Sequence, residues 1–136
     1  MALMTNFLKR YIPLIKQLMR FGVIGVTAAT VHFSIVVCLV ETHTLTPLYA
    51  NVIAFLIAFQ ISYWGHRSWT FAGTTTTHRV AIPRLFAVGT SGLALNQSLF
   101  YFFLTFAQLP YPLALLAVLT ITPLITFTLS KLWVFR

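Results

Sequence analysis

The sequence predicts an all-α polytopic membrane protein, with four transmembrane helices in two parallel two-helix repeats and an N-terminal amphipathic surface helix. Three observations predict this fold class. Hydrophobic residues make up 59% of the 136 residues, charged residues only 7%, and the mean hydropathy is +0.89, whereas soluble domains carry about 25% charged residues. Four apolar segments are long enough to cross a bilayer, and the second half of the chain aligns with the first without a gap.

Residues 1–20 combine a basic face with an apolar face at helical spacing. Lys9, Lys16 and Arg20 lie on the basic face. The opposite face is apolar and contains Met4, Phe7, Leu8, Tyr11, Ile12, Ile15, Leu18 and Met19. This pattern predicts a cytoplasmic surface helix, bent near Pro13; a frayed basic tail is the alternative.

The four spans follow within a four-helix transmembrane domain at residues 21–136. A crossing needs about 20 mainly apolar residues. The spans are expected from about Phe21 to Val40, Leu48 to Gly65, Leu85 to Ala107 and Tyr111 to Ser130. The first and last pairs are joined only by ETHTLTP and QLP, which predicts two tight helical hairpins.

All nine basic residues fall on one side of this topology. They are Lys9, Arg10, Lys16 and Arg20 before the first span, Arg67, Arg79 and Arg84 between the second and third, and Lys131 and Arg136 after the fourth. Because short cytoplasmic loops collect Lys and Arg, both termini are expected in the cytoplasm. The net charge of +8 then predicts contact with anionic lipids and no binding of nucleic acid.

The polar residues exclude most enzyme classes. Asp is absent and Glu41 is the sole acidic residue, so no carboxylate pair is available for acid–base catalysis or for a metal cage. Cys38 is the single cysteine and is interpreted as a small buried hydrophobe. The sequence contains no P-loop. We therefore expect a protein that is not an enzyme and that uses no metal or cofactor.

A shift of 64 positions places residues 20–71 over residues 84–135, with nine identities in 52 positions. The distinctive matches fall at the span boundaries, where Arg20 aligns with Arg84 and Trp69 with Trp133. Each half contains two spans, so both halves insert in the same direction, and a duplicated transporter binds its substrate where the halves meet. Gly and Ala in the spans, including Gly22, Gly25 and Gly89, are expected to allow close helix packing.

Polar residues near the middle of the spans are the candidates for a polar path. His32 and Asn96 occupy equivalent positions and are expected to face the interior, where they can meet. Gln60 and Gln97 complete this set of candidate sugar contacts. The alternative is that these residues make interhelical hydrogen bonds that only hold the bundle together.

The chain resembles the GtrA-like family over about residues 20–136. The resemblance is carried by VHFSIVVCL in the first span, HRSWTF at the end of the second, LALNQSLFYF in the third and TPLITFTLSKLWVF at the end of the fourth. It implies a four-span protein of the bacterial cytoplasmic (inner) membrane. The implied function is flipping of a polyprenyl-phosphate-linked sugar for the decoration of cell-surface polysaccharide and lipopolysaccharide.

Under this hypothesis, cations at the cytoplasmic interface bind the lipid phosphate. The candidates are Arg20 with Arg84 and Arg67 with Lys131, although positive residues at these places are also expected from topology alone. Lys131 stands where the family pattern often has Arg, and Lys cannot make the bidentate contact. Trp69 and Trp133 are candidate sugar-stacking residues or members of an interfacial aromatic belt.

Two alternatives remain open at the level of sequence. The chain can be a non-transporting adaptor of a membrane glycosyltransferase, which the small-residue faces also suit. A small multidrug-type exporter is disfavoured because that family depends on a glutamate in the first span, where this chain has His32. Four spans enclose little space around a large head group, so a homo-oligomer is expected.

Overall fold

The computed structural model describes the backbone of residues 2–70 and 78–134, with side chains described chiefly in 9–69 and 87–125. These residues form four α-helices: α1 (Ala2–Glu41), α2 (Pro47–Gly65), α3 (His78–Thr105) and α4 (Tyr111–Val134). A π-helical segment, η1 (His66–Thr70), directly follows α2. The described part of the chain contains no strand, and the predicted all-α fold class is confirmed.

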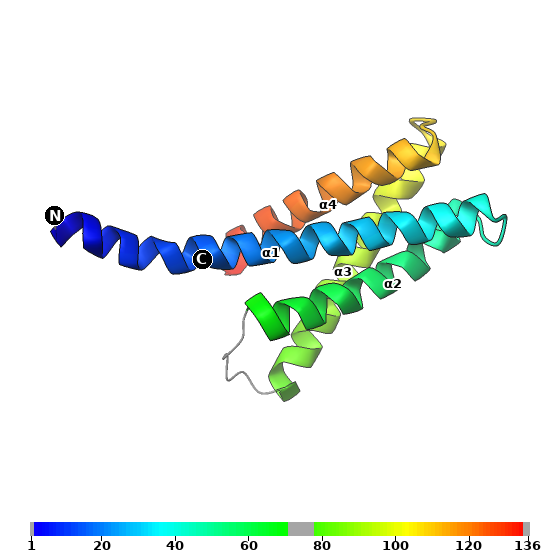
Figure 1. The fold of residues 1–136 in the computed structure, drawn as a ribbon. Coiled ribbons are helices and arrows are strands. Elements are labelled where there is room, and N and C mark those ends of the chain that lie inside the picture. The colour runs from blue at the N-terminus through cyan, green and yellow to red at the C-terminus, as the bar shows by residue number, and fades with distance from the viewer. Residues whose placement is uncertain (1, 71–77, 135–136) are drawn as a thin grey trace.

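The helices form two hairpins that pack against each other. The most extensive packing is between α1 and α2 and then between α3 and α4, while α2 also contacts α3 and α1 contacts α4. Both hairpin turns lie at the same end of the bundle, and the start of α3 and the end of α4 lie toward the other end (Figure 1). The basic residues of the described helices belong to the segments away from the hairpin turns.

The N-terminal segment differs from the prediction, because residues 2–20 do not form a helix of their own. They are the first half of α1, which is one helix of 40 residues with Pro13 inside it. A single proline removes one helical hydrogen bond, and the chain between Pro13 and Phe21 contains no Gly or second Pro to end the helix. At about 1.5 Å per residue, α1 is about 60 Å long, so its first half projects beyond the other helices (Figure 1).

Two described segments have the length and hydropathy of a membrane span. They are Met19–Glu41 in α1 and Pro47–Trp69 in α2 with η1. The apolar part of α4 within the described residues, Tyr111–Ile125, is shorter. The predicted helix limits next to both hairpin turns agree with the structure to within about two residues.

The two hairpins correspond position by position under the 64-residue shift. Their first helices end at Glu41 and Thr105, and their second helices begin at Pro47 and Tyr111. The turn hydrogen bonds correspond as well: Leu45 N–H donates to the Leu39 carbonyl at 3.1 Å, and Leu109 N–H to the Phe103 carbonyl at 3.0 Å. Apart from Ile24 and Ala28, the buried residues that the structure describes form matching pairs: His32 and Asn96, Val36 and Phe100, Ala50 and Ala114, Asn51 and Leu115, Ala54 and Val118, and Ala58 and Thr122.

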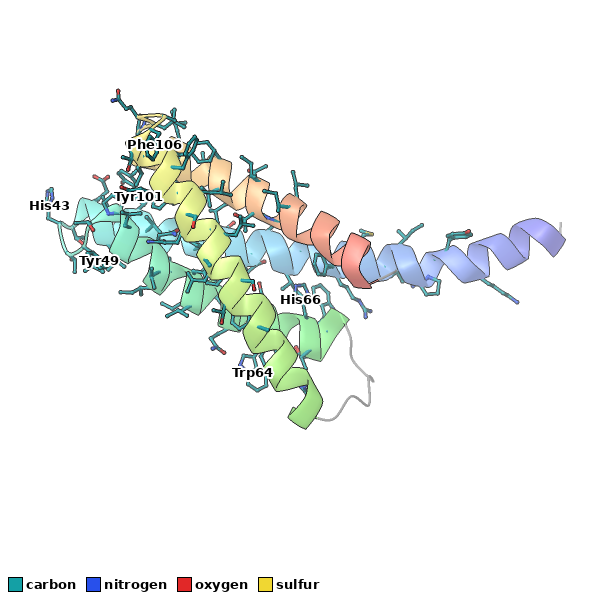
Figure 2. All side chains as sticks on the ribbon, turned by 180° about the vertical axis from the view of Figure 1, so that it is seen from behind. His43, Tyr49, Trp64, His66, Tyr101 and Phe106 are labelled. Atoms are coloured by element: carbon teal, nitrogen blue, oxygen red, sulfur yellow. The ribbon has the colours of Figure 1, made fainter. Side chains whose placement is uncertain are left out.

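Exposed aromatic side chains gather near both ends of the bundle. Tyr49, Tyr101 and Phe106 lie near the hairpin turns, and Trp64 lies toward the opposite end (Figure 2). All four are about half or more exposed. This arrangement is typical of a membrane protein, in which Trp and Tyr gather at the two interfaces.

Glycine packing agrees with the prediction at one position and contradicts it at two. A Cβ atom at Gly89 would lie 2.9 Å from the ring of Phe59, so α2 and α3 approach closely there. Among the described residues, nothing lies within 4 Å of a Cβ added at Gly22 or Gly25, so the predicted close packing at these two glycines is not found in that part of the chain. Gly65 provides the close approach of α2 to α1, because its added Cβ would lie 2.9 Å from Ile24.

We expect Gly65→Ala to lower the free energy of unfolding by about 1 to 3 kcal/mol, because the new methyl group must displace the buried Ile24 side chain. The matched control is Gly25→Ala, which meets open space and should be neutral or stabilising by up to about 1 kcal/mol. Denaturant titration in mixed micelles measures both. Equal effects of the two variants would contradict the packing described here.

Candidate functional site

A buried network of polar side chains joins three helices, with Asn51 of α2 at its centre. His32 Nε2–H of α1 donates to Asn51 Oδ1 at 2.8 Å. Asn51 Nδ2 donates to Asn96 Oδ1 and to Gln97 Oε1 of α3, both at 2.7 Å. Gln97 Nε2 donates to the Leu48 carbonyl at 3.0 Å. The Asn51 amide nitrogen donates to both α3 residues, so the atom that faces His32 is the Asn51 amide oxygen, which can only accept. His32 is therefore the donor in its bond to Asn51.

This network modifies the sequence prediction for His32 and Asn96. Both are 2% exposed and face the interior as predicted, but they meet through Asn51, which is fully buried. Asn51 is not among the site residues predicted from the sequence. The signal was present: Asn51 lies beside Ala50 and one turn before Ala54, on the small-residue side of α2, and a polar residue there should face the protein interior.

The network breaks the correspondence between the two hairpins. Leu115 occupies the position equivalent to Asn51 and is equally buried. The first hairpin therefore places an amide where the second places an aliphatic side chain. Polar contacts in this buried layer connect α2 to α1 and α3.

A second cluster, of basic and aromatic side chains, lies where α1 passes η1. Arg20 Nη1 donates to the Trp69 carbonyl at 3.3 Å, and its guanidinium carbon lies 5.7 Å from the centroid of the Trp69 ring. Phe21 stacks on His66 with 4.4 Å between ring centroids and 19° between planes. Arg67 Nη1 donates to the Tyr63 hydroxyl at 3.4 Å.

The π-helical turn η1 positions this second cluster. It begins where α2 ends at Gly65, and the wider turn carries His66, Arg67 and Trp69. π-helical turns are rare and occur frequently at functional sites. Arg20 and Trp69 are both exposed, so the guanidinium and the indole ring can contact a molecule at the surface. An arginine of this kind offers several donors in the geometry that a phosphate accepts.

The remaining predicted site residues do not all join these clusters. Gln60 is exposed and lines a groove between α2 and α3, apart from the Asn51 network. The side chains of Arg84, Lys131 and Trp133 lie outside the described residues. The predicted pairs of Arg20 with Arg84 and of Arg67 with Lys131 therefore stay predictions.

Glu41, the sole acidic residue, lies at the hairpin-turn end of α1. It is exposed and accepts a hydrogen bond from the Tyr111 hydroxyl at the start of α4. This contact ties the two hairpins together at their turns. A search of the described residues finds no group of three His, Cys, Asp or Glu side chains that could hold a metal ion.

Comparison with known proteins identifies the family. The family described as "GtrA/DPMS, transmembrane domain" matches residues 20–135, which include both hairpins and both polar clusters. No curated protein and no solved structure matches the chain. The family and the apolar helices together indicate a multi-pass membrane protein that fits a role in glycan biosynthesis. The chain belongs to the GtrA/DPMS transmembrane-domain family.

Proposed function

We propose that this protein moves a polyprenyl-phosphate-linked sugar between the leaflets of the bacterial cytoplasmic membrane, for cell-surface glycosylation. Both termini face the cytoplasm in this proposal, and the four helices cross the membrane as a duplicated pair of hairpins. The correspondence of helix ends, turn hydrogen bonds and buried positions supports the duplication. No cofactor and no chemical step is required.

The observation that carries the proposal is the contact of Arg20 with Trp69 at the end of the bundle where the basic residues gather. A phosphodiester head group needs a cation at the interface, and a sugar favours an aromatic neighbour that also hydrogen-bonds. Hydrocarbon offers neither, so unassisted crossing of the charged head is slow. A protein that supplies polar groups at membrane depth lowers this barrier.

Movement in this proposal is downhill. Glu41, the sole carboxylate of the chain, lies at the hairpin-turn end of α1, is exposed and is hydrogen-bonded by Tyr111. A proton relay depends on an ionisable group within the membrane. Glu41 is not placed in the middle of a span, and His32, which is, lies buried with its Nε2–H bonded to Asn51. Synthesis of the lipid-linked sugar on one side and its consumption on the other set the direction.

A second candidate function is that of an adaptor for a membrane glycosyltransferase. Gly22 and Gly25 favour it, because no described residue covers them and another helix can approach α1 closely there. An adaptor would need that face but would not need the polar groups at membrane depth.

Reconstitution separates the two functions. We expect the purified protein alone, in proteoliposomes, to accelerate leaflet exchange of a fluorescently labelled prenyl-phosphate hexose over protein-free vesicles. Exchange should not depend on an imposed proton gradient, for the reason given above. Exchange that appears only when a glycosyltransferase is present would support the adaptor and overturn transport.

A further inference from the structure

Two grooves open on the sides of the bundle, each between helices of different hairpins. One lies between α2 and α3 and has a volume of about 170 Å³; its walls are Phe55, Leu56, Phe59, Gln60, Gly89, Thr90 and Leu93. The other lies between α1 and α4 and has a volume of about 320 Å³; its walls are Val26, Ala29, Thr30, Phe33, Leu116, Leu119 and Thr120. Four of the seven residues in each wall correspond under the 64-residue shift.

The two grooves are equivalent in position but not in chemistry. In the α1–α4 groove, the hydroxyls of Thr30 and Thr120 donate to carbonyls of their own helices, at 2.8 Å in each case. Those polar groups are therefore already paired, and the remaining wall is aliphatic apart from the Phe33 ring. In the α2–α3 groove, the wall carries two aromatic rings, the Gln60 carboxamide and the Thr90 hydroxyl, and the α1–α4 wall has no counterpart of Phe59 or Gln60.

Gln60 provides the strongest indication of a ligand. Its side chain is exposed and makes no hydrogen bond to any residue that the structure describes. Gln60 also lies near the middle of the candidate span Pro47–Trp69, where the surroundings of an exposed side chain are hydrocarbon. An unpaired polar group at that depth is costly, so it requires a polar partner from outside this chain.

The aromatic rings of the α2–α3 groove are held in place. Phe55 and Phe59 lie nearly parallel, with 10° between planes and 6.4 Å between centroids. The Phe59 ring lies close to the α3 backbone at Gly89, where an added Cβ would be 2.9 Å from it. Phe55 meets the ring of His32 edge to face at 6.3 Å, which connects this groove to the Asn51 network.

From these contacts we propose that the α2–α3 groove binds the sugar ring of the lipid-linked substrate at membrane depth; this inference rests on the proposed function. The aromatic faces contact the C–H face of the ring, and the Gln60 amide donates to and accepts from its hydroxyls. The groove is smaller than the roughly 300 Å³ at which pockets for drug-sized ligands begin. It therefore accepts one sugar ring rather than an oligosaccharide.

The test compares binding of sugar-bearing and sugar-free lipids to the full chain in nanodiscs. The probes are short-chain prenyl phosphates carrying glucose, galactose, mannose or N-acetylglucosamine, and the same prenyl phosphate without a sugar. We expect at least one sugar-bearing probe to bind the wild type about fivefold or more tightly than the sugar-free probe, which corresponds to about one net hydrogen bond.

Gln60→Leu is the decisive variant, since Leu124 occupies the equivalent position in the second hairpin and an exposed site tolerates the change. This variant should bind the sugar-bearing and sugar-free probes about equally, and its affinity for the sugar-free probe should equal that of the wild type. Thr120→Leu is the matched control in the other groove, with Leu56 at the equivalent position. It should keep the wild-type preference.

Three outcomes would overturn the groove assignment. They are a wild type that prefers none of the four sugars, a Gln60→Leu variant that keeps the preference, and a Gln60→Leu variant that only changes the oligomeric state, which would place Gln60 between two copies of the chain. A leaflet-exchange assay distinguishes failure of the groove assignment from failure of the proposed function. Sugar-dependent binding without exchange would overturn transport alone, and exchange without sugar-dependent binding would overturn the groove alone.

Discussion

Asn51→Leu should lower the free energy of unfolding by about 2 kcal/mol. The substitution removes all three hydrogen bonds of the Asn51 side chain. It leaves His32 and Asn96 without their partner and Gln97 with only its bond to the Leu48 carbonyl. Interhelical hydrogen bonds in membranes contribute about 0.6 kcal/mol each on average and at most about 1.7, so three together give a loss of this size. Denaturant titration of the purified protein in mixed micelles measures it.

The choice of leucine separates lost hydrogen bonds from poor packing. Leu115 is fully buried at the equivalent position of the second hairpin, so a leucine side chain fits this layer of the fold. Ser34→Ala is the control, because Ser34 is exposed and its hydroxyl bonds only to the Thr30 carbonyl of the same helix. That control should stay within about 0.5 kcal/mol of the wild type.

A double-mutant cycle with His32→Leu tests the connection directly. The only hydrogen bond described for the His32 side chain is to Asn51, so His32→Leu should cost little further stability once Asn51 is leucine. If His32 and Asn51 did not interact, the losses in unfolding free energy of the two single variants would add in the double variant. Additive losses would therefore contradict the network.

The sequence was sufficient to predict the helices because their causes are local. Apolar runs of span length and two short connections predicted both hairpins and their turns. The duplication also predicted that His32 and Asn96 would share a buried layer. The N-terminal helix was placed less well, because Pro13 and the basic face of residues 1–20 do not determine whether α1 continues through them.

The partners of polar residues depend on helix rotation and could not be predicted in this way. The duplication predicts that His32 and Asn96 meet directly, but the amide that joins them is that of Asn51 in α2, where the second hairpin has Leu115. Gly22 and Gly25 have the spacing of a packing face, yet no described residue packs closely against either of them. A small residue shows that a close approach is allowed, and the neighbouring helix decides whether it occurs.

Replacing Arg20 and Arg84 together by Gln should slow leaflet exchange of the labelled prenyl-phosphate hexose about tenfold or more. A charge-assisted hydrogen bond contributes about 1.5 to 3 kcal/mol, and about 1.4 kcal/mol on a barrier is tenfold in rate. Arg20 is exposed and contacts only the carbonyl and ring of Trp69 among the described residues, so the folded protein should persist. The rate is measured relative to wild type in matched proteoliposomes.

The matched control also removes two positive charges, but from the first half of α1, in the double variant Lys9→Gln with Lys16→Gln. It should slow exchange far less, because a general attraction to anionic lipid does not require guanidinium geometry. Arg20→Lys in the Arg84→Lys background adds a second distinction, since it keeps the charge and loses the bidentate contact. Equal slowing in the Lys9 and Lys16 double variant would assign the effect to net charge, and an unchanged rate in the arginine double variant would remove both arginines from phosphate capture.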